Sequence, residues 1–312
     1  MLFSCKQFGG EVWPSGWPSC VQGLCVSEPS GYKAAELSVR RGSHSLNMNK
    51  PVSILLRCFG LNRPTPTTRY GRCVRRAEQI LTVLAVLFVG LHLFPQALFA
   101  YNVSTDGITI YSRSPLPPEA ASCAARAAEL LKQSELAVPG LHEHVYVCDA
   151  HWLFCLFSPG SPSAFAISVP LTDKVFVAAV DFSADVAIRA GSDFNKRSFS
   201  SLVAHEITHG LIRHRLGVLR SMRLPDWVDE GYCDHVARES SFPEAEGLRL
   251  FASGQGHPSV SYRYFSYRLM VRHLMEHQHL TFLQVVARAN EPAAVAAEAR
   301  EALRKASQSL GS

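Results

Sequence analysis

One apolar segment constrains this chain more than any other feature of its sequence. It reads ILTVLAVLFVGLHLFPQALFA, spans residues 80–100 and contains no Asp, Glu, Lys or Arg. A helix that crosses a bilayer needs about 20 apolar residues, so the segment is long enough to do so. A buried core helix is the alternative, but the segment has no polar face and follows a cluster of arginines. We therefore expect a transmembrane signal-anchor in residues 77–100.

Charges flank the segment unequally, with four arginines just before it: Arg69, Arg72, Arg75 and Arg76. The stretch YNVSTDG just after it contains no basic residue. The positive-inside rule then predicts an N-terminus in the cytoplasm and a domain outside it, in residues 101–312. ALFA before Tyr101 loosely resembles a signal-peptidase site, and cleavage there would release the domain.

Residues 1–76 carry most of the excess positive charge. They hold eleven Lys or Arg against three Asp or Glu, whereas the rest of the chain holds 20 against 23. A nucleic-acid-binding protein needs a basic face on its folded domain, so no nucleic-acid partner is expected. Residues 1–33 show no sustained periodicity, and residues 1–76 are predicted to be a basic, disordered cytoplasmic segment. Because Met48 opens MNKPVSILLRCFG, a natural-looking beginning, residues 1–47 are interpreted as a mis-assigned start.

Four of the nine cysteines follow the apolar segment: Cys123, Cys148, Cys155 and Cys233. In an oxidising compartment they permit two disulfides with three possible pairings. Buried free thiols are the alternative, and the sequence leaves both open. No CxxC pair is present, which argues against a cysteine zinc site.

The outer part of the chain mixes strand and helix patterns. DGITIYSRS, HVYVCDA and KVFVAAVDF predict strands. PPEAASCAARAAELLKQSELAV predicts a helix that ends at Pro139 and Gly140. Followed by a further helix, this order predicts an α+β domain with a small mixed sheet packed on helices.

The stretch VAHEITHG, residues 203–210, carries a metal-site pattern on a helix expected from Ser198 or Ser200 to Gly217. Six apolar residues predict one buried stripe on it: Phe199, Leu202, Val203, Ile207, Leu211 and Ile212. His205 and His209 are one turn apart, so both imidazoles can converge on one metal ion. Glu206 projects about 100° away, where it can act as a base on water but not as a ligand.

A catalytic zinc needs three protein ligands and one open position. His214 is a poor third ligand, because it follows His209 by five residues on the same straight helix and points elsewhere. Glu230 is the better candidate, since LPDWVDEGYCDHVAR predicts a second helix, capped by Asp226. Asp234 lies one turn after Glu230 on the same face, where it can orient a ligand histidine.

HEITH, followed about twenty residues later by WVDEGYCDHV, resembles the gluzincins, the thermolysin- and aminopeptidase-like zinc peptidases. Their HExxH…WLxEGxAxY motif is matched at Trp227, Glu230 and Gly231, and the ExxxD of thermolysin-like members at Glu230 and Asp234. The chain most resembles small bacterial peptidase-MA-like proteins with a membrane anchor. The resemblance covers residues 198–234. It implies a zincin-like fold with HExxH on a central helix.

The resemblance also implies roles for single residues. His205, His209 and Glu230 would bind one Zn²⁺ per chain, and Glu206 would be the general base. In this group a tyrosine from a later helix often stabilises the oxyanion, and SYRYFSYRLMVRHL, residues 261–274, predicts such a helix. Tyr264 is assigned by position, with Tyr262 and Tyr267 as alternatives.

Two further features bear on the substrate. AFAISV or KVFVAAV could supply the edge strand that pairs with an extended substrate. The GxMEN-type signature of aminopeptidases is missing, so nothing indicates N-terminal trimming.

The histidines at 273, 277 and 279 are interpreted as surface residues.

Together these features predict a membrane-anchored zinc-dependent peptidase that acts on a peptide or protein substrate. The expected location is a bacterial inner membrane, with the N-terminus cytoplasmic and the catalytic domain periplasmic. One alternative is a zinc hydrolase that acts on a non-peptide amide bond. Another is a catalytically silent zincin-like scaffold, although the complete residue set argues against it. The sequence does not indicate an oligomeric state.

Overall fold

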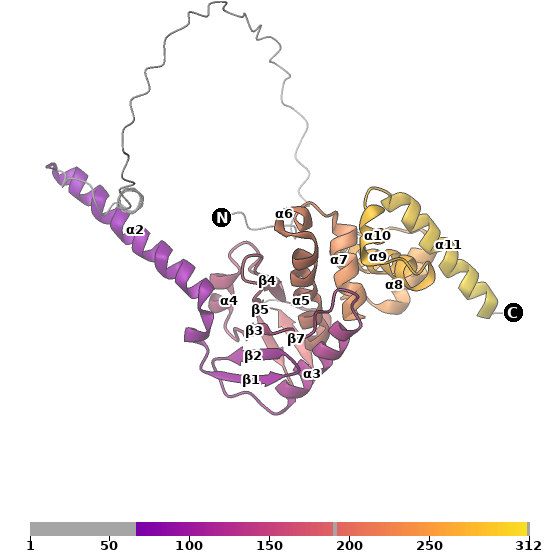
Figure 1. Ribbon diagram of the computed structural model, residues 1–312, viewed down its shortest axis with the longest axis horizontal. Helices are drawn as coiled ribbons and strands as arrows, with labels where there is room; N and C mark the ends of the chain where they lie inside the picture. The colour runs from indigo at the N-terminus through magenta and orange to yellow at the C-terminus, as the bar shows by residue number, and fades with distance from the viewer. Residues whose placement is uncertain (1–66, 190–191, 311–312) are drawn as a thin grey trace, which may run out of the picture. The chain divides into compact units, whose positions relative to one another are not determined.

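The computed structural model of the protein describes residues 67–189 and 192–310 (Figure 1). The possible false start, residues 1–47, and most of the segment predicted to be disordered lie outside these residues. The chain divides into two compact units, whose described parts are residues 67–89 and residues 90–310.

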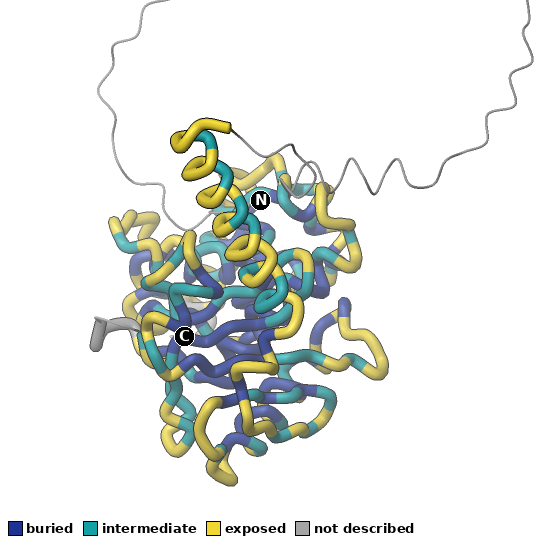
Figure 2. Tube along the Cα trace, turned by 90° about the vertical axis from the view of Figure 1, so that its left-hand side faces the viewer, coloured by how far each residue is buried: buried dark blue, intermediate teal, exposed yellow. Residues whose placement is uncertain are grey.

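Helix α2 (Arg69–Leu93) contains most of the apolar segment. It begins among the arginines and ends at Leu93, and the short 3-10 helix η1 (Pro95–Leu98) follows. The helix is long and apolar enough to cross a membrane. None of its residues is buried, as Figure 2 shows, so it does not have the burial expected of a core helix. Its exposed apolar side chains include Ile80, Leu81, Val83, Leu84, Val86 and Leu87.

A five-stranded mixed sheet forms the framework of the second unit, in the order β1-β2-β3-β5-β4 (Figure 1). Its strands are β1 (Tyr101–Thr105), β2 (Ile108–Ser112), β3 (Glu143–Val147), β4 (Ala166–Ser168) and β5 (Val175–Val177). The three inner strands are parallel, and both edge strands are antiparallel to their neighbours. The small mixed sheet on helices is therefore confirmed.

Both faces of this sheet are buried, as an internal parallel sheet requires. Alternate residues of β3 divide between two cores: Val145 and Val147 belong to the main core, and Tyr146 belongs to a smaller aromatic core. Helix α3 (Glu119–Lys132) contributes to the main core, and α4 (His151–Phe157) contributes to the smaller one.

The segment KVFVAAVDF was predicted to be one strand, and that prediction is wrong. It divides into β5 and β6 (Ala179–Asp181), which belong to different sheets. Ala178 between them turns its N–H to the carbonyl of Phe165 (2.9 Å). Strand β6 pairs with β7 (Val186–Arg189), which pairs with β8 (Ser192–Ser198), and neither β7 nor β8 was predicted.

Helix α5 (Phe199–Leu216) lies beside β4 and packs on α7 (Asp226–Ala237), as Figure 1 shows. Its bounds match the predicted ones, but it is buried on nearly all sides rather than along one stripe, because Ser200, Ser201 and Thr208 are buried too. The remaining elements are α6 (Val218–Ser221), α8 (Glu244–Ser253), α9 (Val260–Arg272), η2 (His273–His277), α10 (Phe282–Ala287) and α11 (Pro292–Leu310).

Two expectations about side chains are settled by the fold. The five cysteines in the described part of the chain are free thiols, and Cys123, Cys148 and Cys233 are buried. His277 and His279 lie on the surface, but the prediction for His273 is wrong. The helix continues through a π-helical turn at η2, which buries His273 against Gln278 (Nε2 to Nε2, 3.0 Å).

Candidate metal centre

The start of α5 is held by two carboxylates rather than by its own N-cap side chain. Ser198 is the N-cap, but its hydroxyl donates to Glu239 Oε2 (2.5 Å) instead of capping the helix. Asp185 accepts bonds from the backbone N–H (3.0 Å) and the hydroxyl (2.6 Å) of Ser200. These bonds satisfy donors that a helix start leaves unpaired, and they fix the direction in which α5 enters the core.

Helix α7 is positioned by a close approach to α9. A Cβ atom at Gly231 would lie 2.7 Å from the backbone oxygen of Tyr267, so only glycine allows the two backbones to meet here. This contact brings α9, and with it Tyr264, towards the residue before the glycine, Glu230. Pro225 is the N-cap of α7, so Asp226 is its first residue and not the predicted cap.

The two motif histidines and Glu230 come together between α5 and α7. The Oε2 atom of Glu230 lies 3.3 Å from His205 Nε2 and 3.9 Å from His209 Nε2. The two imidazole rings are 5.0 Å apart and nearly perpendicular. All three side chains are mostly buried, so three metal-ligating groups from two helices face one another inside the protein.

The second nitrogen of each histidine faces a carboxylate on α7. His205 Nδ1 donates to Asp234 Oδ1 at 2.7 Å, and His209 Nδ1 lies 3.2 Å from Asp229 Oδ1. Such bonds orient an imidazole and leave its Nε2 atom for a metal. Asp234 therefore lies where the sequence placed it, and Asp229 is a partner that the sequence analysis missed.

Arg197 completes the buried part of the centre. Its guanidinium donates to Asp234 Oδ1 at 2.6 Å, so one carboxylate oxygen accepts from both Arg197 and His205. Burial alone would raise the pKa of Asp234, but Arg197 and His205 together lower it to about 2. The Asp234 carboxylate is therefore ionised at neutral pH.

Both histidines are more basic than usual in the metal-free protein. Burial and Arg197 lower the pKa of His205, but Asp234 and Glu230 outweigh them and raise it to about 9. Burial also lowers the pKa of His209, while Asp229 and Glu230 raise it above its ordinary value. The centre therefore attracts positive charge, whether as protons or as a cation.

A divalent metal fits these residues. The Oε2 atom of Glu230 is buried and accepts no hydrogen bond, although it faces both Nε2 atoms. Four acidic residues lie near enough to the buried Cys233 thiol to affect its pKa: Glu206, Asp229, Glu230 and Asp234. One buried cation, Arg197, pairs with Asp234. Buried charges need compensation, and a cation between two imidazoles and a carboxylate supplies it.

Cys233 offers a second possible donor. Its Sγ atom can join His205 and His209 in one metal-binding group, with the ligand atoms within 4.8 Å of one another. However, Sγ lies 3.4 Å from His209 Nδ1, the nitrogen that already faces Asp229. Burial first, and then the nearby carboxylates, raise the pKa of this thiol well above its ordinary value. We therefore favour Glu230 as the third ligand.

A cleft of about 190 Å³ opens beside the centre. His205, Glu206 and Tyr264 line it, and so does Ala166 of the edge strand β4. Arg213 of α5 donates to Ser168 Oγ (2.7 Å), which ties β4 along the helix. In the described part of the chain β4 has no strand on its outer side, so AFAISV does form a sheet edge, whereas β5 lies inside the sheet.

The other candidate residues lie elsewhere. Tyr262 is buried and donates to the carbonyl of Gln255 (2.9 Å), and Tyr267 does not line the cleft. His214 is exposed on α5 and faces Asp173 (Nε2 to Oδ2, 3.4 Å), so it is not a ligand of this centre.

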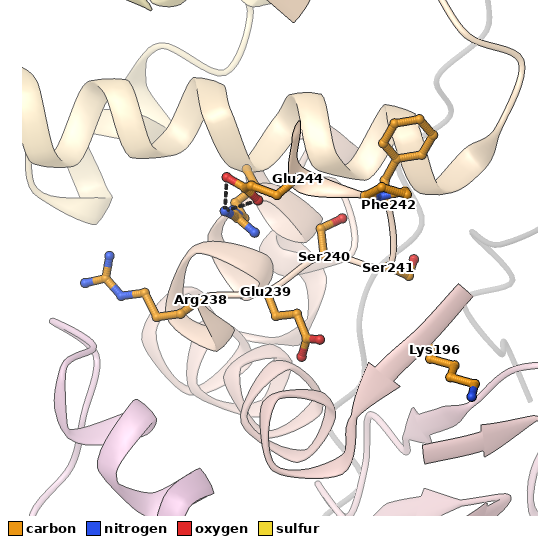
Figure 3. A pocket seen from close by; sticks show the side chains of 9 residues that line it. Lys196, Arg238, Glu239, Ser240, Ser241, Phe242 and Glu244 are labelled. Atoms are coloured by element: carbon orange, nitrogen blue, oxygen red, sulfur yellow. Dashed lines mark hydrogen bonds and ion pairs between the residues drawn. The ribbon is translucent and has the colours of Figure 1, made fainter. Parts of the chain in front are cut away.

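A larger cleft of about 400 Å³ lies near the start of α8 (Figure 3). Two of its cations, Arg238 and Lys196, extend to opposite sides. A third, Arg268, is paired with Glu244 (2.9 Å). The cations do not converge, so this cleft has no evident charged centre.

Three residues of the centre had no recognised signal in the sequence: Arg197, Asp229 and Cys233. Asp229 adjoins Glu230 and could have been found as a second acidic residue on the same helix. Cys233 was set aside because it belongs to no CxxC pair. Arg197 lies on a strand that was not predicted, and nothing local indicates its long-range partner.

In comparisons with known proteins, no family model, no curated protein and no solved structure matches the chain.

Proposed function

We propose that the chain is a zinc-dependent peptidase with a zincin-like fold, anchored in a membrane by α2. One observation carries this proposal: His205 Nε2, His209 Nε2 and the unpartnered Glu230 Oε2 face one another beside a cleft lined by Glu206. Zinc bound there would act as a Lewis acid that polarises a carbonyl group and acidifies water. The complete set of ligands, base and cleft favours an enzyme over a silent scaffold.

Glu206 is the general base of the proposed reaction. It follows His205 on α5, is mostly buried and lines the cleft. From this position its carboxylate takes a proton from the attacking water and passes it to the leaving amine. The ligand histidines have their Nδ1 atoms engaged by Asp234 and Asp229, so they are held in place while Glu206 moves the proton.

Tyr264 is the proposed oxyanion donor. Burial, and then Glu230, raise the pKa of its hydroxyl, so the group keeps its proton and can donate it in a hydrogen bond. A donor directed at the developing negative charge is worth about 100-fold in rate. A Tyr264→Phe variant should therefore lose about 100-fold in kcat with little change in KM.

The cleft favours a peptide bond as the substrate. The edge strand β4 can pair with an extended peptide through its backbone, and a peptide supplies both the donors and the acceptors that such pairing needs. A small non-peptide amide would not pair with the edge of β4, so we consider it the less favoured class of substrate.

The test combines metal content with hydrolysis, measured on the same preparations of the chain in detergent. Elemental mass spectrometry should find about one zinc per wild-type chain, and the metal should be lost from a His205→Ala/His209→Ala variant. A Glu206→Gln variant should keep its zinc and lose hydrolysis of a diverse peptide library. Zinc-free wild-type protein after reconstitution would refute the metal centre, and full activity of Glu206→Gln would refute the mechanism.

The proposed location is extracytoplasmic. The arginines at the start of α2 keep that end in the cytoplasm under the positive-inside rule, which leaves residues 101–312 on the periplasmic side of a bacterial inner membrane. Protease added to spheroplasts should then digest the catalytic domain, and protection of the domain until lysis would reverse this topology.

A further inference from the structure

Among the side chains that the structure describes, Arg189 is the arginine of this cleft that has no acidic partner. It ends strand β7 and lines the same cleft as His205, Glu206 and Tyr264. Its Nε atom is buried without a hydrogen-bond partner, and no acid of the described residues forms an ion pair with it. The other arginine of this cleft, Arg197, is paired with Asp234 at 2.6 Å. Arg189 therefore has a positive charge and an Nε donor that no side chain in the described part of the chain uses.

The guanidinium is held in a fixed orientation. Its central carbon lies 5.5 Å from the centre of the Phe165 ring, within the range of a cation–π contact. Phe165 itself is fixed, because its carbonyl accepts from the N–H of Ala178 and it directly precedes β4. A guanidinium presents its N–H donors in one plane, which is the geometry that a carboxylate accepts.

The surroundings favour a carboxylate over a neutral group at this position. The metal centre next to it contains several acidic residues, so a substrate carboxylate that enters the cleft is stabilised only beside a cation, and Arg189 supplies one. Phe165 and Leu202 add apolar surface to the lining of this cleft, which lowers the local dielectric and strengthens a charge pair.

We propose that Arg189 forms a subsite for a carboxylate of the peptide, either the side chain of Asp or Glu or the C-terminal carboxylate. The inference rests on the proposed peptidase function in one respect: if the chain is a peptidase, the subsite directs cleavage to bonds near an acidic residue or near the C-terminus of the substrate. It goes beyond that function because it assigns the chemical class of one substrate group.

The experiment measures binding separately from hydrolysis. Zinc-loaded Glu206→Gln protein binds fluorescent peptides that share one neutral sequence and carry Glu or Gln at each successive position, with a free or an amidated C-terminus. At least one carboxylate peptide should bind about 10-fold more tightly than its uncharged match. Preference for Glu over Gln identifies a side-chain subsite, and preference for the free over the amidated end identifies a C-terminal subsite.

Variants of Arg189 connect the preference to this residue. Arg189→Met keeps the length of the side chain beside Phe165 and should abolish the preference. Arg189→Glu should instead favour peptides with Lys at the same position. The matched control is Arg249→Met on the exposed surface of α8, which removes one positive charge far from the cleft lining and should leave the preference intact.

The outcomes separate this subsite from the peptidase itself. A preference that persists in Arg189→Met, the absence of any preference, or the absence of binding by every peptide would each overturn the subsite. Wild-type protein is tested for hydrolysis of the same peptides in parallel. Hydrolysis without an Arg189-dependent preference would leave the peptidase standing, whereas Arg189-dependent binding without hydrolysis would leave only the subsite.

Discussion

His205 and His209 each direct one nitrogen towards Glu230 and the other towards a carboxylate of α7, yet the two halves of the centre differ in burial. In the inner half, the side chains of His205 and Asp234 are 5% and 0% exposed, and their hydrogen bond is 2.7 Å long. In the outer half, His209 and Asp229 are 16% and 14% exposed, and their contact is 3.2 Å long.

The inner half also contains a buried arginine, because Arg197 pairs with the Asp234 carboxylate at 2.6 Å. A fully buried carboxylate cannot be screened by water, so Asp234 needs a cation from the protein as well as from the histidine. The side chain of Asp229 is partly exposed, so water screens part of its charge. The same pair, an imidazole and a carboxylate, should therefore contribute differently to stability on the two sides of the candidate metal centre.

Removal of the inner carboxylate should have the largest effect. Asp234→Asn leaves the Arg197 guanidinium buried without a charged partner, which should reduce the free energy of unfolding by about 3–5 kcal/mol. Asp229→Asn should reduce it by less than about 1 kcal/mol, because its pair is partly solvated. Urea denaturation of the metal-free protein in EDTA measures both.

A double variant controls for this interpretation. Arg197→Met/Asp234→Leu removes both buried charges and should recover most of the stability that Asp234→Asn loses. Equal losses in Asp234→Asn and Asp229→Asn would contradict the distinction between an inner and an outer half.

Displacing α7 as a whole should affect both halves together, since both carboxylates and Glu230 lie on it. Gly231→Ala places a methyl group 2.7 Å from the backbone oxygen of Tyr267, so α7 and α9 must separate, at a cost of about 1–3 kcal/mol. Zinc affinity should fall as well. Gly210→Ala is the matched control, because its methyl group meets only ordinary contacts at 3.6 Å from Asp173. Thermal unfolding should show Gly210→Ala at or above wild-type stability.

The pH dependence of the metal-free protein should report most strongly on the inner half, and the raised pKa of His209 adds to the same alkaline decline. The pKa of His205 is raised to about 9, so its contribution to stability is complete below pH 6.5 and is lost as the pH rises through 9. The pKa of Asp234 is lowered to about 2, so its contribution is present above pH 4 and is lost only in strong acid. Denaturation midpoints in EDTA should therefore fall between pH 7 and pH 9.5.

Two variants test which histidine causes the loss of stability at alkaline pH. His205→Gln should remove most of the alkaline decline. His235→Gln should leave the decline in place, because burial lowers the pKa of His235 to about 4 and the group stays neutral throughout this range. A decline that survives in His205→Gln would assign it to another group.

The smallest effect is expected at Cys233. Its sulfur lies on the Nδ1 side of His209, away from the nitrogen that faces Glu230, so Cys233→Ser should bind zinc within about a factor of two of wild type. Glu230→Gln should lower zinc affinity at least about 10-fold, since it removes the charge of the proposed third ligand. A competition titration with a chromophoric chelator measures both, and the reverse order would make Cys233 the third ligand.

The sequence predicted the local elements of the centre better than their partners. The bounds of α5 and α7 follow from periodicity, proline and glycine, all of which are local signals. The pairing of Arg197 with Asp234 joins a strand to a helix 37 residues away, and neither residue signals the other. The division between β5 and β6 was also missed, because both halves of that run are apolar and nothing marks Ala178 as the point where the chain changes sheets.

The apolar segment illustrates the same limit. Its composition predicted a helix long enough to cross a bilayer, and α2 has that length, but the helix begins at Arg69 and ends at Leu93 rather than matching residues 77–100. Helix ends depend on backbone bonds that hydropathy does not register, and Pro95 ends α2 a few residues before the apolar composition does.

Strand β4, which has no outer neighbour among the described strands, is only three residues long. A chain that adds to such an edge must lie fully extended across it, which a residue inside a helix or an inner strand cannot do without first unfolding. If the chain is a peptidase, it would therefore select substrates first by whether a segment can become extended, and only then by side-chain chemistry. Tails, linkers and damaged chains offer such segments, whereas tightly folded proteins do not.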